Sequence, residues 1–172
     1  KNSKLEAFKE TLQEVVCENG NKVIIFCEYL EMVRILIKEM QALGLKYLEI
    51  TGETPVKDRA GFQKIFNESK EIDAIIGTDA MNAGLNLTGA SYVIHYSDNW
   101  SPSLMAQRDA RALRIGQKRT VTVVNFICRD TVEERVRGAL YNKAKVSSDV
   151  LGDNVDDSLL KRLGPKEILD LL

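Results

Sequence analysis

The chain has 172 residues, of which 44% are hydrophobic and 28% are charged, and its formal net charge is −1. These values fit one globular domain with a full core, and they exclude a disordered chain. No apolar run is long enough to span a bilayer, so we expect no membrane partner. The first four residues lead into a charged helical pattern and do not resemble a signal peptide.

The near-neutral total charge hides a basic block. Residues 99–147 carry 10 basic and 4 acidic side chains, a net charge of +6. Such a block on a neutral chain indicates a local anionic ligand, either a nucleotide phosphate or a nucleic-acid backbone. A solvated helix face explains the same charges, and the composition alone favours that simpler interpretation.

Apolar runs and helical patterns alternate along most of the chain. Amphipathic or capped stretches predict helices, and continuous apolar runs predict strands that are buried on both faces. The expected helices are 4–19, 30–43, 56–67, a segment from Ser101 or Ser103 to Ile115, and 131–150. The expected strands are 22–28, 46–51, 71–78, 91–97 and 120–128.

Five strands separated by helices predict an α/β fold, with a mainly parallel sheet between two layers of helices. In such a sheet, ligands bind in the loops beyond the carboxyl ends of the strands. We expect this lobe to span residues 1–153. Residues 154–172 are expected to form an acidic tail with a short final helix.

Few residues are available for metal or redox chemistry. The chain has one histidine, His95, which lies within a predicted strand and is expected to be a core residue. Its three cysteines form no CxxC pair, and we interpret Cys27 and Cys128 as buried, reduced thiols of an intracellular protein. No metal site is expected.

A phosphate-binding loop is absent from the sequence. Neither GxxxxGK[ST] nor GxGxxG occurs. The first predicted strand leads instead into residues 28–31, Glu-Tyr-Leu-Glu, which are acidic and bulky and would repel a phosphate. We infer that this lobe does not hold a nucleotide by itself in the usual way.

The densest chemistry lies in residues 107–117, Gln-Arg-Asp-Ala-Arg-Ala-Leu-Arg-Ile-Gly-Gln. On one continuous helix, Gln107, Arg111 and Arg114 stand at i, i+4 and i+7 and share a face. Leu113 should then point into the core. Two arginines with a glutamine behind them form a donor array that suits phosphate oxygens. A pair of surface arginines on an amphipathic helix explains the spacing equally well.

Several segments, in order, resemble motifs of the Swi/Snf family within helicase superfamily 2. Residues 107–117 resemble the last helicase motif, with the Arg-Ile-Gly-Gln ending that is typical of this family, and residues 77–79 with 83–88 resemble the fifth. Four further segments resemble parts of the second motor lobe of that family, namely residues 22–28, 47–67, 98–102 and 131–153. The resemblance implies a RecA-like C-terminal lobe of a DNA-dependent ATPase.

That resemblance implies an ATP site shared between two lobes. Arg111 and Arg114 would reach across a cleft to the γ-phosphate of ATP, bound with Mg²⁺ mainly by an N-terminal RecA-like lobe. Gln107 would help to orient them, and Gly84 and Asn86 would lie near the nucleotide. The whole motor would translocate on double-stranded DNA, whereas this lobe alone would be an inactive monomer.

Four positions are implied to contact the nucleic-acid backbone: Thr51, Gly52, Thr78 and Trp100. Simpler explanations stay open for two of them. Thr78 could merely end its strand, and a lone tryptophan before a helix is often a packing residue.

The chain departs from the family at two places. Ala110 and Leu113 stand where the family has an aspartate and a histidine, and residues 80–82 replace glycines of the fifth motif. The departures indicate a divergent, microbial or viral member located in the cytoplasm; a eukaryotic member would be nuclear. Two other functions stay open, namely a lobe of a strand-separating DNA or RNA helicase and a non-catalytic interaction module.

Overall fold

The computed structural model describes residues 3–82, 84–97, 102–113, 117, 120–135 and 137–138. Within these ranges, five strands form one sheet: β1 (Val23–Phe26), β2 (Tyr47–Ile50), β3 (Ala74–Gly77), β4 (Tyr92–His95) and β5 (Thr122–Asn125). The strand order is β2-β3-β1-β4-β5, and all four pairings are parallel. The predicted parallel α/β sheet is therefore confirmed, with every strand inside the range predicted for it.

The inner strands of the sheet are apolar because both of their faces are covered. All four residues of β1, Val-Ile-Ile-Phe, are buried, and so are all four residues of β3. A strand covered on both faces has no side that faces water, so its sequence does not alternate between apolar and polar residues. The edge strand β2 has one covered face and contains the exposed Glu49.

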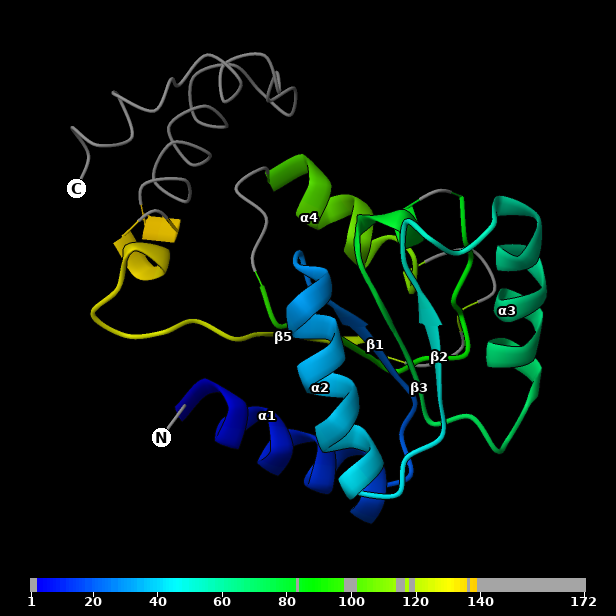
Figure 1. Cartoon of the computed structure of the whole chain (residues 1–172), viewed down its shortest axis with the longest axis horizontal. Coiled ribbons are helices and arrows are strands. Elements are labelled where there is room, and N and C mark those ends of the chain that lie inside the picture. The colour runs from blue at the N-terminus through cyan, green and yellow to red at the C-terminus, as the bar shows by residue number, and fades with distance from the viewer. Residues whose placement is uncertain are drawn as a thin grey trace.

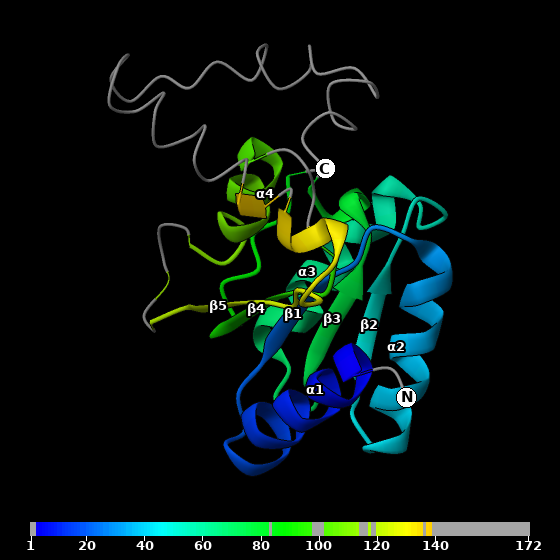
Figure 2. The same cartoon turned by 90° about the vertical axis from the view of Figure 1, so that its left-hand side faces the viewer.

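Helices form a layer on each face of the sheet (Figures 1 and 2). On one face lie α1 (Ser3–Leu12), its π-helical continuation η1 (Gln13–Glu18), and α2 (Leu30–Ala42), whose apolar residues pack on Ile25, Ile76 and Ile94. On the other face lie α3 (Val56–Glu68) and the 3₁₀ helix η2 (Asp79–Asn82). Their buried residues Phe66 and Met81 belong to a second apolar cluster with Ile24, Ile75 and Val93.

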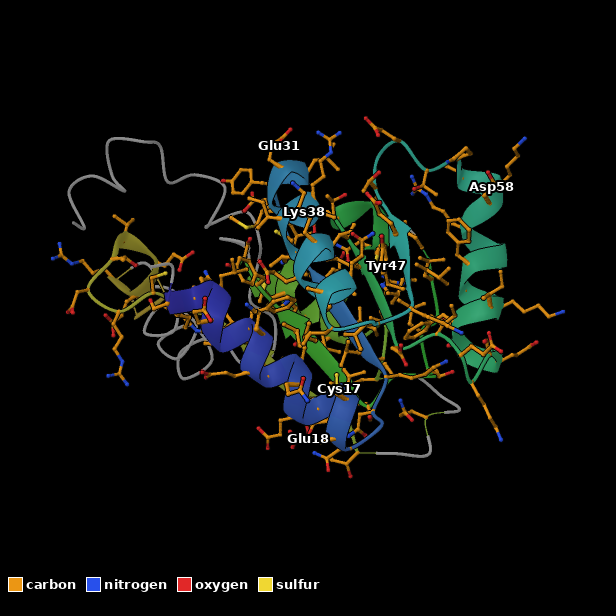
Figure 3. The ribbon with its side chains drawn as sticks, turned by 60° about the horizontal axis from the view of Figure 1, so that its bottom comes forward. Cys17, Glu18, Glu31, Lys38, Tyr47 and Asp58 are labelled. Atoms are coloured by element: carbon orange, nitrogen blue, oxygen red, sulfur yellow. The ribbon has the colours of Figure 1, made fainter. Side chains whose placement is uncertain are left out.

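The helix α2 has the amphipathic pattern expected of an outer layer. Its buried residues Val33, Leu36, Ile37 and Met40 recur at a spacing of three to four and face the sheet. Glu31 and Lys38 are exposed on the side away from it (Figure 3). Gly44 ends the helical segment with a φ of +74°, a backbone conformation that favours glycine.

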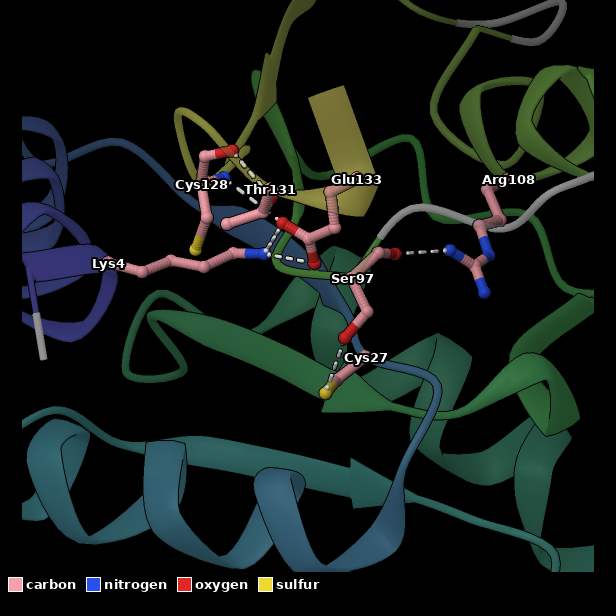
Figure 4. A network of polar contacts seen from close by, with 7 residues as sticks. All are labelled: Lys4, Cys27, Ser97, Arg108, Cys128, Thr131 and Glu133. Carbon is pink, nitrogen blue, oxygen red and sulfur yellow. Dashed lines mark hydrogen bonds and ion pairs between the residues drawn. The ribbon is translucent and has the colours of Figure 1, made fainter. Parts of the chain in front are cut away.

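A polar clasp joins the first helix to the segment after β5 (Figure 4). The Lys4 ammonium donates to both carboxylate oxygens of Glu133 at 2.9 Å, and it lies 5.2 Å from the centre of the Tyr96 ring. Burial raises the pKa of Tyr96 to about 12. Burial also opposes ionisation of Glu133, but the Cys128 backbone N–H and Lys4 outweigh it and lower the pKa of that carboxylate. The charged pair thus ties α1 to the segment after β5.

Some predicted features lie outside the described residues. These are Trp100, Arg114, the greater part of the helix expected at 131–150, and the acidic tail at 154–172. Among the helices that the structure describes, none is both long and apolar enough to cross a membrane.

Gly77, at the end of β3, tests the strand packing. A Cβ at this position would lie 1.8 Å from the backbone oxygen of Ile50 on β2, so alanine cannot enter without moving the strand. We expect Gly77→Ala to lower the free energy of unfolding by about 3 kcal/mol, measured by urea denaturation of this chain. The matched control is Gly61→Ala in α3, where a Cβ meets open space and alanine should stabilise by about 0.5–1 kcal/mol. If the Gly77→Ala variant is as stable as the unsubstituted chain, β2 and β3 do not pack as closely at Gly77 as described.

Candidate functional site

The loops after β1, β2, β3 and β4 meet at one edge of the sheet because all the strands run in the same direction. Backbone bonds continue the ladder past the strand ends: Cys27 donates to Gly77 at 3.0 Å, Thr78 to Ile50 at 3.2 Å, and Tyr96 to Phe26 at 2.9 Å. Three of the site residues that the sequence predicts, Thr51, Gly52 and Thr78, lie in loops at this carboxyl edge. Ligand sites of open parallel sheets belong at this edge.

The loop after β2 contains two of the predicted backbone contacts. Gly52 is exposed, and a Cβ there would meet open space. Thr51 is 4% exposed, and its hydroxyl accepts the backbone N–H of Glu53 at 3.3 Å. Gly52 is therefore the accessible member of the pair, whereas Thr51 shapes the turn that presents it.

Thr78 begins the loop after β3. Its backbone N–H is bonded to Ile50, its carbonyl accepts the N–H of Met81 at 3.0 Å, and its hydroxyl oxygen lies 3.5 Å from the N–H of Ala80. The backbone amide is therefore already engaged. The hydroxyl hydrogen is the group of Thr78 that can still be donated to a phosphate.

Arg59, which the sequence analysis did not single out, connects these two loops. From α3 its guanidinium donates twice to the Thr54 carbonyl, at 3.1 and 3.0 Å, and once to the Ala80 carbonyl at 3.0 Å. One planar side chain therefore holds the loop of Thr51 against the start of η2. No sequence motif pointed to it, because its partners are backbone atoms 5 and 21 residues away.

Gly84 and Asn86, expected near the nucleotide, lie in the loop between η2 and β4. Gly84 is exposed and has a φ of +75°, a conformation that glycine adopts without strain. Asn86 is held by its backbone: its N–H donates to Gln63 at 2.7 Å, and its carbonyl accepts from the Asn67 side chain at 2.8 Å. The two side chains on α3 thus fix this loop in place.

The prediction of one continuous helix to Ile115 is wrong. The helix α4 runs from Pro102 to Asp109, and residues 110–112 form a turn. The chain leaves the helix because the Arg111 carbonyl accepts the Leu87 N–H at 2.8 Å, which draws the turn onto the neighbouring loop. As a result Gln107 is exposed and Arg111 is buried, so they do not share one face. Leu113, expected in the core, is 55% exposed.

Arg111 points into the lobe. It is 7% exposed, and its Nη1 donates to the Leu85 carbonyl at 3.3 Å. Gln117 fastens the same region, since its side-chain amide donates to the carbonyls of Thr88, Ala90 and Ala112 at 2.9–3.3 Å. The turn at 110–112 and the loop at 84–90 are therefore joined at several points.

Arg108, also missed by the sequence analysis, is fully buried beside the exposed Gln107. It pairs with Asp79 at 2.8 Å and donates to the Ser97 carbonyl at 3.0 Å. On the next residue, the Asp109 carboxylate lies 2.7 Å from Nε2 of the buried His95. His95 is thus a core histidine, as predicted, and Arg108 and Arg111 do not belong to a solvated helix face.

Burial at the carboxyl edge opposes negative charge. It raises the pKa of Cys27, although the hydrogen bond between Cys27 and Ser97 and the charge of Arg108 act in the opposite direction. It also raises the pKa of Glu28, where Arg108 again opposes the shift. Within the described ranges, no three His, Cys, Asp or Glu side chains gather as metal ligands. The guanidinium and hydroxyl groups of the site are donors that suit phosphate oxygens.

These features define a class of protein. A family model described as the helicase conserved C-terminal domain matches residues 3–116. The chain therefore belongs to that family, and its five-stranded parallel sheet is a RecA-like lobe.

Individual relatives narrow the class. The DNA excision repair protein CSB of Oryza sativa subsp. japonica is 34% identical over 163 residues, which are 94% of this chain and 14% of that protein. The C-terminal part of the Fun30 ATPase domain superimposes with a TM-score of 0.80 at 28% identity, covering 98% of this chain and 51% of that one. The Sulfolobus solfataricus SWI2/SNF2 ATPase core domain superimposes with a TM-score of 0.71 at 27% identity, covering 95% of this chain and 33% of that one. The chain is thus a helicase C-terminal lobe of the SNF2 family, and the predicted Swi/Snf resemblance is confirmed.

The bridging role of Arg59 can be tested by measuring the free energy of unfolding. We expect Arg59→Met to lower the free energy of unfolding by about 2 kcal/mol, because two backbone carbonyls lose a charged donor. Arg34→Met is the control, since Arg34 is exposed on α2 and pairs with the exposed Glu31; its effect should be below about 0.5 kcal/mol. Equal effects of the two substitutions in urea denaturation would remove Arg59 from this role.

Proposed function

We propose that this lobe works in a two-lobed motor that couples ATP hydrolysis to movement along double-stranded DNA inside the cell. The N-terminal RecA-like lobe of the same protein holds ATP and Mg²⁺. This lobe supplies Arg111 and Arg114 to the γ-phosphate and contacts the DNA backbone through its carboxyl edge. In this view the lobe alone neither hydrolyses ATP nor binds DNA tightly.

The observation that carries the proposal is the junction between two loops. The turn of Arg111 is bonded to the loop at 84–90, which continues the segment that begins with Thr78. A change at a phosphate bound to one loop can therefore be felt at the other. An SNF2-type lobe that lacks a phosphate loop but holds guanidinium groups is suited to complete an ATP site on a partner lobe.

A finger role requires Arg111 to turn outward. Its guanidinium now donates to the Leu85 carbonyl, a neutral acceptor. The γ-phosphate of ATP is a stronger, charged acceptor. When the two lobes close, exchange of the Leu85 carbonyl for this phosphate is therefore favourable for the side chain. Gln107, already exposed on α4, faces outward and can order water or the arginines in the closed state.

Contacts with DNA are proposed at Gly52, through its backbone, and at Thr78, through its hydroxyl, with Thr51 shaping the first of these loops. We place Trp100 at the same DNA surface, and Gly84 and Asn86 beside the nucleotide. Since such contacts go to phosphates, DNA binding should be largely independent of sequence and should weaken as salt increases.

The finger assignment is tested in the full-length motor with Arg114→Ala. We expect DNA-stimulated turnover to fall by about a thousandfold or more, because the transferring phosphoryl group loses a charged donor, while ATP binding changes little. Steady-state hydrolysis and nucleotide binding on saturating double-stranded DNA measure the two effects. Arg34→Ala on α2 is the control and should turn over normally. If Arg114→Ala hydrolyses ATP like that control, Arg114 is not a finger.

A further inference from the structure

Arg108 is the largest fully buried side chain in the part of the chain that the structure describes, although it carries a charge. Leaving water is costly for a guanidinium group unless charged and polar partners replace its hydration. An apolar side chain could occupy this position instead, since a methionine is similar in length and would fill the same space. The partners that hold Arg108 therefore indicate what it does.

These partners come from three different strand ends. Nε and Nη2 lie 2.9 and 2.8 Å from the same oxygen of Asp79, the first residue of η2. Nη1 donates to the carbonyl of Ser97, after β4, at 3.0 Å (Figure 4). The guanidinium carbon lies 5.4 Å from the centre of the Phe26 ring, at the end of β1. One side chain on α4 therefore contacts the carboxyl ends of β1, β3 and β4.

Its location links the two proposed ligand sites. Asp79 directly follows Thr78, and Arg108 stands three residues before Arg111 in the chain. Asp79 also accepts from the side-chain amide of Asn82 at 2.9 Å, so its carboxylate is fixed within η2 before it meets Arg108. A shift of η2 must move this carboxylate, and with it the end of α4.

We propose that Arg108 is a positioning residue, whose guanidinium fixes the turn of Arg111 against the loop of Thr78 through Asp79 and the Ser97 carbonyl. The planar, forked donor group suits this task better than a lysine, because it bonds two acceptors in fixed directions at once. Its consequence for ATP turnover rests on the proposed function; its consequence for the geometry of the lobe does not.

The test variant is the double substitution Arg108→Met and Asp79→Asn. Methionine keeps the length of the side chain, and asparagine keeps the oxygen that Asn82 bonds, so no unpaired charge is left behind. Hydrogen exchange on this chain is then measured at the Leu87 amide, which donates to the Arg111 carbonyl, and at the amides of β1.

We expect exchange at Leu87 to accelerate by about tenfold or more while exchange in β1 stays unchanged, because the turn opens locally. Unchanged exchange at Leu87, or equal acceleration at both places, would overturn the proposal, since it would reveal no effect or a purely global loss of stability. If the double variant does not fold, Arg108→Lys is judged by the same comparison.

The full-length motor separates this proposal from the finger assignment. The double variant should lower kcat by about tenfold or more with KM for ATP changed by less than about twofold, because a misplaced group costs rate and not binding. Arg108→Lys should recover part of kcat. Normal turnover in the double variant beside loss of turnover in Arg114→Ala would overturn the positioning role alone. Normal turnover in both would overturn the finger assignment.

Discussion

The parallel pairing of five strands is the constraint on which this lobe depends. Because β1 to β5 all run the same way, the loops that follow four of them meet at one edge, and helices must cover both faces. The covered faces require the apolar runs of β1 and β3. At the shared edge, arginines from α3 and α4 bond the loops that contain Thr51, Thr78 and Ser97.

Arginines hold the loops of this lobe together, and Arg59, Arg108 and Arg111 each bond backbone carbonyls. Arg59 joins the loops after β2 and β3, Arg108 joins those after β3 and β4, and Arg111 holds the loop before β4. Carbonyls at strand ends have no further strand to accept from, and a guanidinium group satisfies several of them at once. Guanidinium donors of this kind also suit phosphate oxygens.

The sheet was predictable from sequence because its signal is local. Residues 23–27, Val-Ile-Ile-Phe-Cys, form an uninterrupted apolar run, and a strand covered on both faces explains such a run well. The end of α4 was not predictable, since the Leu87 N–H that draws the turn away comes from a loop 24 residues earlier in the chain. For the same reason, the prediction that Gln107 and Arg111 share one helix face was wrong. Arg108 stood within the segment that drew attention, but only its burial reveals which way it points.

The central claim is that this lobe completes an ATP site on another lobe. It is tested most directly by measuring DNA-stimulated ATP hydrolysis for the 172-residue chain alone and for the same chain joined to its N-terminal lobe. If the claim holds, the chain alone shows no turnover above background, and turnover that depends on double-stranded DNA appears once both lobes are joined. Hydrolysis by the isolated chain would contradict it.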